Sequence, residues 1–357
     1  MTSINEMQKT LLSSELTHKN SFDFLRFLFA LSVVFGHYYV LTNKLDDCFW
    51  PISTPMAVSG FFIISGFLIT WSYCNNNDLK TYLKKRAKRI MPAYYTVVIL
   101  CALLFCLISA FSLKDYFCSI HFLKYLTANI SFMNFIEPQL PGVFINNYMD
   151  AVNGALWTIK VEIALYLSVP VYCFLIRKKM DTGMLCIFIY VISIAFSIYC
   201  NFLFDKTGNN MYNIIGRQFI GQFKYFISGA VILFYYDIFR KYFKVLFISA
   251  LVIFFIHYFK MLSHNALNVV IDILYPISFA ALIIGIAFNF KYLNNFGKYG
   301  DFSYGIYLIH FPVIQTLIHF KIHEYNFIAT LFLSIIITIT LAALSWHLIE
   351  KHFLKRK

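Results

Sequence analysis

The stretch SFDFLRFLFALSVVFGHYYV, residues 21–40, is long and apolar enough to cross a lipid bilayer as one helix. It nevertheless contains two ionisable side chains, Arg26 and His37, and such groups are costly within a membrane. The two are eleven residues apart, which places them on one helical face about 16 Å from each other. We therefore expect both to be functional, although a snorkelling arginine and a histidine that bonds between helices would also fit.

The composition places the whole chain among polytopic membrane proteins. Of its 357 residues, 60% are hydrophobic and only 13% are charged. Apolar runs predict ten membrane-spanning helices, at about residues 22–42, 54–73, 91–111, 153–175, 183–203, 217–236, 243–260, 268–288, 302–320 and 327–349. The expected fold is an all-α integral membrane domain over residues 21–350, with short cytoplasmic tails at 1–20 and 351–357 and no appended soluble domain.

Basic residues set the expected orientation of the chain. Lys and Arg gather in the segments that follow the second, fourth, sixth, eighth and tenth spans, and few lie in the opposite loops. Positive loops stay in the cytoplasm, so we expect both termini there. The net charge of +13 then describes a cytoplasmic face suited to anionic lipid or an anionic ligand, and gives no reason to expect nucleic acid.

The cysteines and the longest loop carry weaker signals. The eight Cys show neither CxxC nor mixed Cys/His spacing, so no metal site is expected. Cys48 and Cys118 both fall in outward loops, and the sequence leaves open whether they form a disulfide. The long outward segment 112–152 is expected to contain a short helix near 114–130 before a turn around Pro141.

Further motifs join the first stretch, and together they carry a family resemblance. The motifs are Asp23-x-Leu25-Arg26 with His37, Ser59-Gly-Phe-Phe-Ile-Ile-Ser65-Gly66-Phe67-Leu68, Arg86-Ala-Lys-Arg89-Ile-Met-Pro92-Ala-Tyr94-Tyr95, Ala155-Leu-Trp157-Thr-Ile-Lys160-Val161-Glu162, and Ser303-Tyr304-Gly305-Ile-Tyr307-Leu-Ile-His310 with the terminal Glu350. In this order the set resembles the acyltransferase-3 family of integral membrane acyltransferases. Thr158 and Ile163 stand where the family has Ser and a second Glu, so only a role that rests on Glu162 carries over.

The resemblance implies an O-acyltransferase of the bacterial inner membrane. Members of the family usually move acetyl from cytoplasmic acetyl-coenzyme A to a hydroxyl of a surface glycan such as O-antigen or exopolysaccharide, and we expect that reaction here. The motifs do not report which sugar or hydroxyl is the acceptor. The expected partners are acetyl-coenzyme A, a glycan or lipid-linked glycan and membrane lipid, with or without a separate extracytoplasmic protein that completes transfer.

The ionisable residues of the first span suit this chemistry. Acyl transfer from a thioester needs a base for the acceptor proton and stabilisation of the oxyanion. His37 is the expected base, because a neutral imidazole titrates near the required range, and it could instead carry the acyl group itself. Arg26 is expected to guide or polarise the donor. His310, in the last motif, either lines the same pore or bonds to another helix.

Arg86 and Arg89 form the expected coenzyme site. They are three positions apart, so on a helix both guanidinium groups face one way and can bind phosphate oxygens through paired hydrogen bonds. A simple positive-inside anchor would suit the neighbouring lysines better than these two arginines. Pro92 is expected in the first turn of the third span, where its missing N–H is harmless.

Glu162 completes the set of expected catalytic residues. It lies about halfway through the fourth span, and Lys160, two positions earlier, faces another side of the helix. A buried carboxylate needs a partner, and other spans offer Arg26, His37 or Lys224. Glu162 either orients a catalytic cation, lines the acceptor route, or forms half of a structural ion pair.

Two other functions stay open at this point. Buried charges in a polytopic chain also suit a transporter or a flippase for lipid-linked sugars, in which Arg26, Lys160 and Glu162 would form the path. The second alternative is an O-antigen polymerase, which would be better supported by a larger outward loop than residues 112–152. Neither alternative consumes acetyl-coenzyme A, so that reaction separates them from an acetyltransferase.

Overall fold

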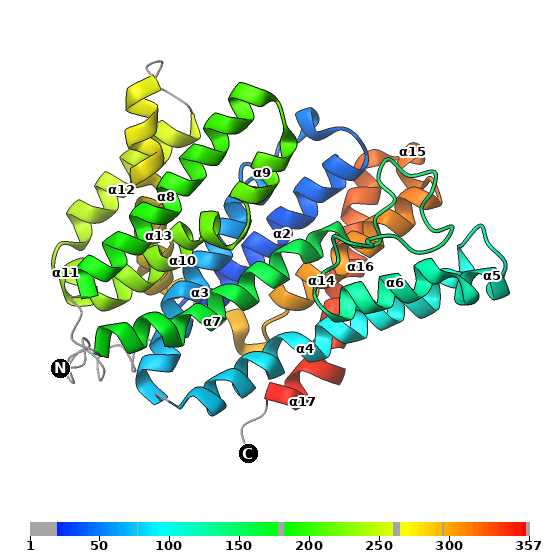
Figure 1. Ribbon diagram of the computed structural model, residues 1–357, viewed down its shortest axis with the longest axis horizontal. Helices are drawn as coiled ribbons and strands as arrows, with labels where there is room; N and C mark the ends of the chain where they lie inside the picture. The colour runs from blue at the N-terminus through cyan, green and yellow to red at the C-terminus, as the bar shows by residue number, and fades with distance from the viewer. Residues whose placement is uncertain (1–19, 77, 178–181, 260–264, 295, 355–357) are drawn as a thin grey trace. The chain divides into compact units, whose positions relative to one another are not determined.

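Every regular element that the structure describes is a helix. The structure is a computed structural model, and it describes residues 20–354 apart from 77, 178–181, 260–264 and 295 (Figure 1). These residues form α-helices, short 3₁₀-helices and a π-helix. The predicted all-α fold is therefore confirmed. The predicted N-terminal tail lies almost wholly outside the described residues, as do the last three residues of the C-terminal tail.

A helix occupies each of the ten predicted spans. These helices are α2 (Phe22–Leu41), α3 (Thr54–Asn76), α4 (Leu79–Leu104), α7 (Trp157–Arg177), α8 (Thr182–Thr207), α10 (Phe219–Phe234), α12 (Phe243–Tyr258), α13 (Asn265–Asn289), α14 (Ser303–His319) and α16 (Phe327–Ser345). Within the described residues, seven helices are long and apolar enough to cross a membrane. The others, α10, α12 and α14, contain 16, 16 and 17 residues. At about 1.5 Å per residue they fall short of a hydrocarbon core of about 30 Å, so the count of ten spans stays a prediction.

Shorter elements connect the long helices. They are η1 (Leu45–Asp47), η2 (Phe105–Leu107), α5 (Leu113–Cys118), α6 (Ile120–Ile130), η3 (Gly154–Leu156), α9 (Asn210–Gly216), α11 (Tyr236–Lys241), η4 (Lys291–Leu293), η5 (Phe296–Tyr299), α15 (Ile322–Tyr325), the π-helix η6 (Trp346–Glu350) and α17 (Lys351–Leu354). The predicted helix near 114–130 is confirmed as α5 and α6. Gly142 follows them at a φ of 68°, a turn conformation that glycine adopts without strain. Cys48 and Cys118 are both free thiols in this structure.

Helix α4 begins earlier than the sequence predicts. It starts at Leu79, where the Asp78 carboxylate accepts the backbone N–H of Thr81 at 2.9 Å and caps the helix. The lysines and arginines that follow favour helix, so the helix continues from the basic segment into the apolar one. Pro92 therefore lies inside α4, and its expected place in the first turn of a span is wrong.

The chain divides into two compact units, each of which combines separated segments. Unit 1 contains Met1–Leu25, Val58–Tyr82 and Val161–Lys298, and unit 2 contains Arg26–Ala57, Leu83–Lys160 and Tyr299–Lys357. Four of the five boundaries fall within the long helices α2, α3, α4 and α7, and the fifth falls within η5. These four helices therefore contribute residues to both units.

Close packing of helix backbones characterises unit 1. In this unit α8 packs beside α10, and α12 beside α13 (Figure 1). A Cβ at Gly66 of α3 would overlap the backbone carbonyl of Phe226 in α10, and a Cβ at Gly229 would overlap that of Ile63. Glycine is therefore required at both positions for this approach of the two backbones.

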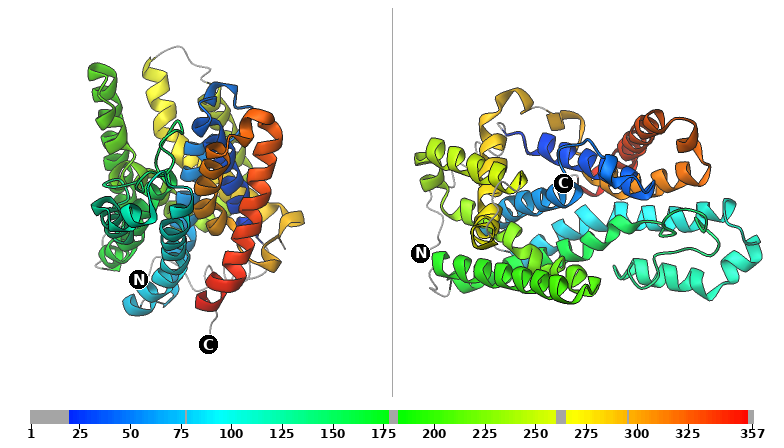
Figure 2. Two further views of the ribbon diagram at one scale, coloured as in Figure 1. Left: turned by 90° about the vertical axis from the view of Figure 1, so that its right-hand side faces the viewer. Right: turned by 90° about the horizontal axis from the view of Figure 1, so that it is seen from above.

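Helix α14 forms the centre of unit 2. It packs along α16, as both views of Figure 2 show, and most of its side chains are buried. Pro312 lacks an N–H and so leaves the Leu308 carbonyl without its usual helical donor. The Asn153 side-chain amide, which precedes η3, donates to this carbonyl at 2.8 Å. The fully buried Gln315 donates to two backbone carbonyls of the segment before Asn153, so polar side chains fix α14 to that segment.

Candidate functional site

Helix α2 carries the two ionisable residues of the opening motif, and their partners lie just before α14 and midway along it. Arg26 Nη1 lies 3.7 Å from Asp301 Oδ2, and His37 Nδ1 lies 2.7 Å from His310 Nε2. The helix is unbroken between Arg26 and His37. Both side chains therefore contact the same segment of unit 2, residues 301–310, as expected for two residues on one face of a helix.

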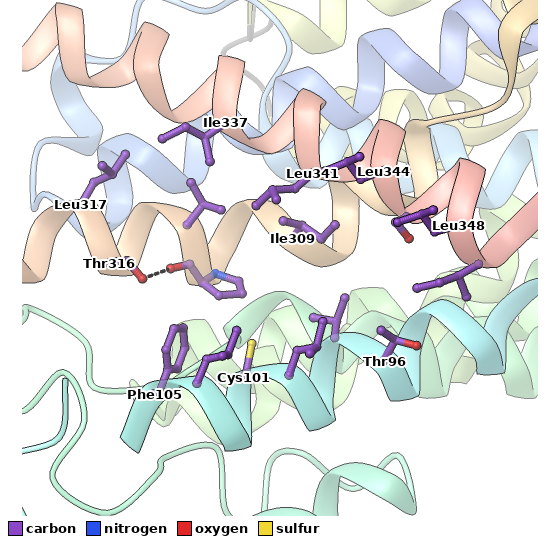
Figure 3. A pocket seen from close by; sticks show the side chains of 17 residues that line it. Thr96, Cys101, Phe105, Ile309, Thr316, Leu317, Ile337, Leu341, Leu344 and Leu348 are labelled. Atoms are coloured by element: carbon purple, nitrogen blue, oxygen red, sulfur yellow. Dashed lines mark hydrogen bonds between the residues drawn. The ribbon is translucent and has the colours of Figure 1, made fainter. Parts of the chain in front are cut away.

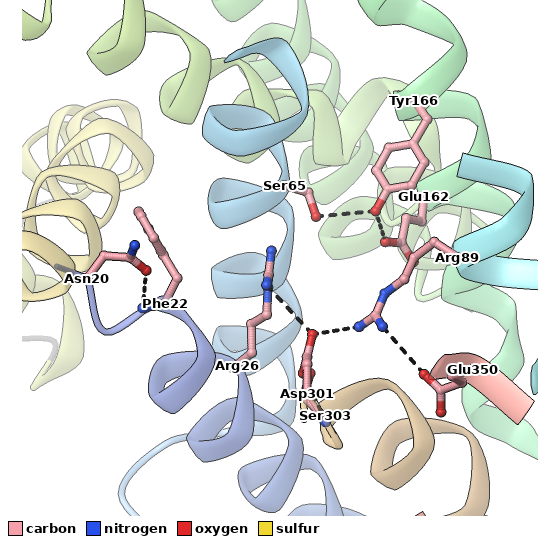
Figure 4. A network of polar contacts seen from close by, with 10 residues as sticks. All are labelled: Asn20, Phe22, Arg26, Ser65, Arg89, Glu162, Tyr166, Asp301, Ser303 and Glu350. Carbon is pink, nitrogen blue, oxygen red and sulfur yellow. Dashed lines mark hydrogen bonds and ion pairs between the residues drawn. The ribbon is translucent and has the colours of Figure 1, made fainter. Parts of the chain in front are cut away.

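Four charged side chains of unit 2, Arg26, Arg89, Asp301 and Glu350, form an ion-pair cluster (Figure 4). Arg89 joins the two carboxylates, because its Nη2 lies 2.6 Å from Asp301 Oδ2 and its Nη1 lies 3.4 Å from Glu350 Oε2. Asp301 in turn links Arg89 to Arg26. Two cations thus balance two anions, which reduces the cost of holding them in a partly dry environment.

Asp301 is held as a carboxylate by its neighbours. Burial would raise the pKa of this group, but the charges of Arg89 and Arg26, together with hydrogen bonds from Ser303, lower the pKa below its ordinary value. Asp301 belongs to none of the sequence motifs. Its position just before the apolar run of α14 is the signal that could have identified it, since acidic residues are favoured near the start of a helix.

The two arginines of the third motif have different surroundings. Arg89 belongs to the ion-pair cluster, and its guanidinium carbon also lies 5.4 Å from the centre of the Tyr304 ring. Arg86, one turn earlier on α4, is half-buried, whereas the three lysines of the same segment are exposed. The side chains thus separate into exposed lysines, which suit a membrane-surface anchor, and arginines that lie partly inside the protein.

His37 and His310 are joined edge to edge. Their rings are 4° from parallel with centres 5.0 Å apart, which together with the 2.7 Å contact places the hydrogen bond in the plane of both rings. His310 is fully buried, and its Nδ1 lies 3.1 Å from the Ile306 carbonyl oxygen. His37 is only half-buried. Of the two imidazoles, His37 is therefore the one that a substrate can reach.

The fourth and fifth motifs meet beside this histidine pair. The hydroxyls of Thr158 and Tyr307 are 2.7 Å apart, and Tyr307 also donates to the Ala155 carbonyl. Thr158 therefore supplies a hydroxyl where the family has serine. The ring of Phe311, the residue after His310, packs edge-on against His37. This region of α14 is thus fixed on both sides of the imidazole pair.

Glu162 lies in unit 1 and has a partner on its own helix. Tyr166, four residues later on α7, donates a hydrogen bond to its carboxylate, and Ser65 on α3 lies 3.5 Å from the same tyrosine hydroxyl (Figure 4). Lys160, in unit 2, instead has its Nζ 3.9 Å from the centre of the Phe135 ring. The two charges have different partners, as their different helical faces predict.

A largely apolar pocket of about 520 Å³ lies within unit 2 (Figure 3). Side chains of α4, α14 and α16 line it, among them Cys101, Ile309, Leu317 and Leu341. Ser345 also lines the pocket and donates to Glu350 of the ion-pair cluster. The pocket therefore connects to the cluster through this serine, and its apolar walls suit a hydrocarbon better than a sugar.

The side chains at this site favour acid–base chemistry. His37 supplies a reachable imidazole, and the arginines of α2 and α4 supply positive charge in the same unit. In the part of the chain that the structure describes, no group of three or more His, Cys, Asp or Glu side chains is placed to hold a metal ion. The arrangement can remove a proton from a hydroxyl and can bind an anion.

Comparison with known proteins agrees with the sequence motifs. A family model described as an acyltransferase domain matches residues 19–347. An O-acetyl transferase of Shigella phage Sf6 is 27% identical over 346 residues, which cover 95% of this chain and 97% of the relative. Nodulation protein 10 of Rhizobium leguminosarum bv. viciae is 26% identical over 360 residues, which cover 95% of this chain and 94% of the relative.

A shorter similarity joins the chain to a third curated protein. The acyltransferase MdmB of Streptomyces mycarofaciens is 23% identical over 177 residues, which cover 43% of this chain and 39% of that protein. No solved structure matches the chain.

Proposed function

Because the chain belongs to the acyltransferase-3 family and is a membrane acyltransferase, we propose that it moves acetyl from cytoplasmic acetyl-coenzyme A to a hydroxyl of a bacterial surface glycan such as O-antigen or exopolysaccharide. The phage relative named O-acetyl transferase supports acetyl as the group, since it matches almost the full length of both chains. The observation that carries the proposal is the half-buried His37, which lies against a fully buried histidine in the same unit as Arg86 and Arg89.

In the proposed reaction His37 acts as a general base. It removes the proton of the acceptor hydroxyl while the oxygen attacks the thioester carbonyl. The carbon–sulfur bond then breaks, coenzyme A leaves as a thiolate, and the proton held by His37 returns to the sulfur. If His37 carries the acetyl group itself, an imidazole nitrogen first displaces the coenzyme A thiolate, and the acceptor hydroxyl then displaces the imidazole, so a carbon–nitrogen bond forms and breaks while the net reaction is unchanged. Arg26 polarises or guides the donor, and the role expected of Glu162, which belongs to unit 1, stays a prediction.

The coenzyme phosphates bind Arg86 and Arg89 in this proposal. Arg89 already neutralises Asp301 and Glu350, so a phosphate must compete with two carboxylates for its guanidinium group. Arg86 is half-buried and lies among the exposed lysines of α4, whose positive charge also favours an anionic ligand. We therefore assign the larger share of coenzyme binding to Arg86.

The direct test of this function is acetyl transfer by the purified protein. In lipid nanodiscs the chain should release free coenzyme A thiol from acetyl-coenzyme A faster when deacetylated surface glycan is added, and mass spectrometry should find acetyl on the glycan. Nanodiscs without the protein are the control. Translocation of a lipid-linked sugar without consumption of acetyl-coenzyme A would instead identify a flippase.

The proposed topology has ten spans, both termini in the cytoplasm and the chain in the bacterial inner membrane. The distribution of Lys and Arg supports it. We predict that a cysteine introduced at Lys244 is labelled only from the cytoplasmic side, and one introduced at Asn146 only from the outside. Labelling of intact cells with a membrane-impermeant maleimide, in a variant without the native cysteines, measures this. Labelling of both positions from one side would contradict the ten-span topology.

A further inference from the structure

The contacts of His310, the buried partner of His37, determine which of its ring nitrogens donates a hydrogen bond and which accepts one. The Nδ1 atom of His310 faces the backbone carbonyl oxygen of Ile306 at 3.1 Å. A carbonyl oxygen can only accept, so Nδ1 of His310 carries the hydrogen. In the neutral imidazole the other nitrogen, Nε2, is then unprotonated and can only accept. The helical backbone of α14 thus fixes the tautomer of His310.

The same reasoning extends from His310 to His37. The Nε2 of His310 lies 2.7 Å from Nδ1 of His37, which is the length of a strong hydrogen bond. Since Nε2 accepts, Nδ1 of His37 must donate. The remaining nitrogen of a neutral His37, its Nε2, is therefore without a proton and is available as a base.

We propose that His310 is a positioning residue, which holds His37 in the Nδ1–H tautomer and thereby presents His37 Nε2 to the acceptor hydroxyl. This inference rests on the proposed role of His37 in acyl transfer. The hydrogen bond between the two rings is the same before and after His37 takes up a proton, because Nδ1 of His37 carries a hydrogen in both states. Proton transfer at Nε2 therefore needs no rearrangement of the pair.

The packing around the pair is suited to this positioning role. The hydrogen bond lies in the plane of both rings, so rotation of either ring would break it. Asn153 and Thr158 hold the turn of α14 that precedes His310, through Leu308 and Tyr307. His310 itself is fully buried and has no route to a bulky acceptor. It acts on the reaction through His37.

The tautomer can be measured without any assay of acetyl transfer. Nitrogen-15 NMR of histidine-labelled protein in lipid separates the two neutral forms, and subtraction of the His37→Gln spectrum assigns the His37 signals. We expect the parent to show the Nδ1–H form of His37. In His310→Phe, which keeps a flat ring but accepts no hydrogen bond, we expect the Nε2–H form to appear.

Kinetics provide the second readout. His310→Phe should lower kcat by at least about 10²-fold with little change in the KM for acetyl-coenzyme A, since the base is misoriented while the coenzyme site is intact. His310→Gln should recover part of kcat, because its amide oxygen can accept from His37 Nδ1. The matched control is His319→Phe, the same change nine residues later on α14, and it should behave like the parent.

The outcomes distinguish this inference from the proposed function. An Nε2–H form of His37 in the parent would overturn the inference even if the His310 variants failed to fold. Unchanged kcat in a folded His310→Phe protein would overturn it as well. If the parent shows the expected tautomer but acetylates no glycan, the proposed acceptor is wrong while the assignment of His310 as the group that fixes His37 still holds.

Discussion

Replacement of His37 by alanine is expected to lower the rate of acetyl transfer by at least about 10²-fold while the protein still folds and enters the membrane. The physical reason is the loss of the base that removes the acceptor proton. The measurement is the acetyl content of the host glycan, together with release of coenzyme A thiol by the purified variant, each compared with the parent at equal membrane abundance.

Two companion variants make this result specific. His37→Gln keeps an N–H that can donate to His310 but supplies no base, so it should be as inactive as His37→Ala and more stable, because the buried His310 nitrogen retains a donor. His121→Ala changes an exposed histidine of α6, and its activity should equal that of the parent. Near-normal acetylation by well-expressed His37→Gln would refute the assignment of His37 as the base.

The second large effect separates the two arginines of α4. Arg89→Ala should destabilise the protein by about 3 kcal/mol, because Glu350, which is only 2% exposed, loses the cation of its ion pair and Arg26 becomes the one cation of the cluster beside Asp301. Arg86→Ala should weaken acetyl-coenzyme A binding by about tenfold or more. Thermal unfolding and equilibrium binding in detergent measure the two quantities.

Controls for the arginine variants follow from the cluster geometry. The double change Arg89→Leu with Glu350→Gln removes one cation and one anion together, so it should recover part of the stability lost in Arg89→Ala. Lys88→Ala, on an exposed side chain of the same helix, should match the parent in both measurements. Acetyl-coenzyme A binding by Arg86→Ala that equals binding by the parent would contradict the role assigned to Arg86.

Local pattern predicted the helices well and their ends less well. Apolar length located a helix at every expected span, because burial in lipid or protein requires long runs of apolar side chains. The start of α4 was misplaced because hydropathy marks where apolar residues begin, whereas Asp78 caps the helix well before that point. Hydropathy also could not show that α10, α12 and α14 are too short to qualify as candidate spans.

The relative positions of site residues could be predicted where both residues lie on the same helix. The common face of Arg26 and His37 follows from eleven residues of regular helix. The hydrogen bond from Tyr166 to Glu162 also joins two neighbours on one helix, although only charged groups of other helices were expected as partners of Glu162. The pairing of His37 with His310 joins residues 273 positions apart, and sequence spacing carries no distance across such a gap.

The order of chain synthesis determines when the ion-pair cluster can assemble. Arg89 leaves the ribosome 212 residues before Asp301 and 261 before Glu350, the carboxylates that neutralise it. Until α14 and η6 have been made, the growing chain holds cationic side chains in apolar helices without these counter-charges. Pairing of Arg89 with Glu350 therefore comes late in biogenesis, after almost the whole domain has been synthesised.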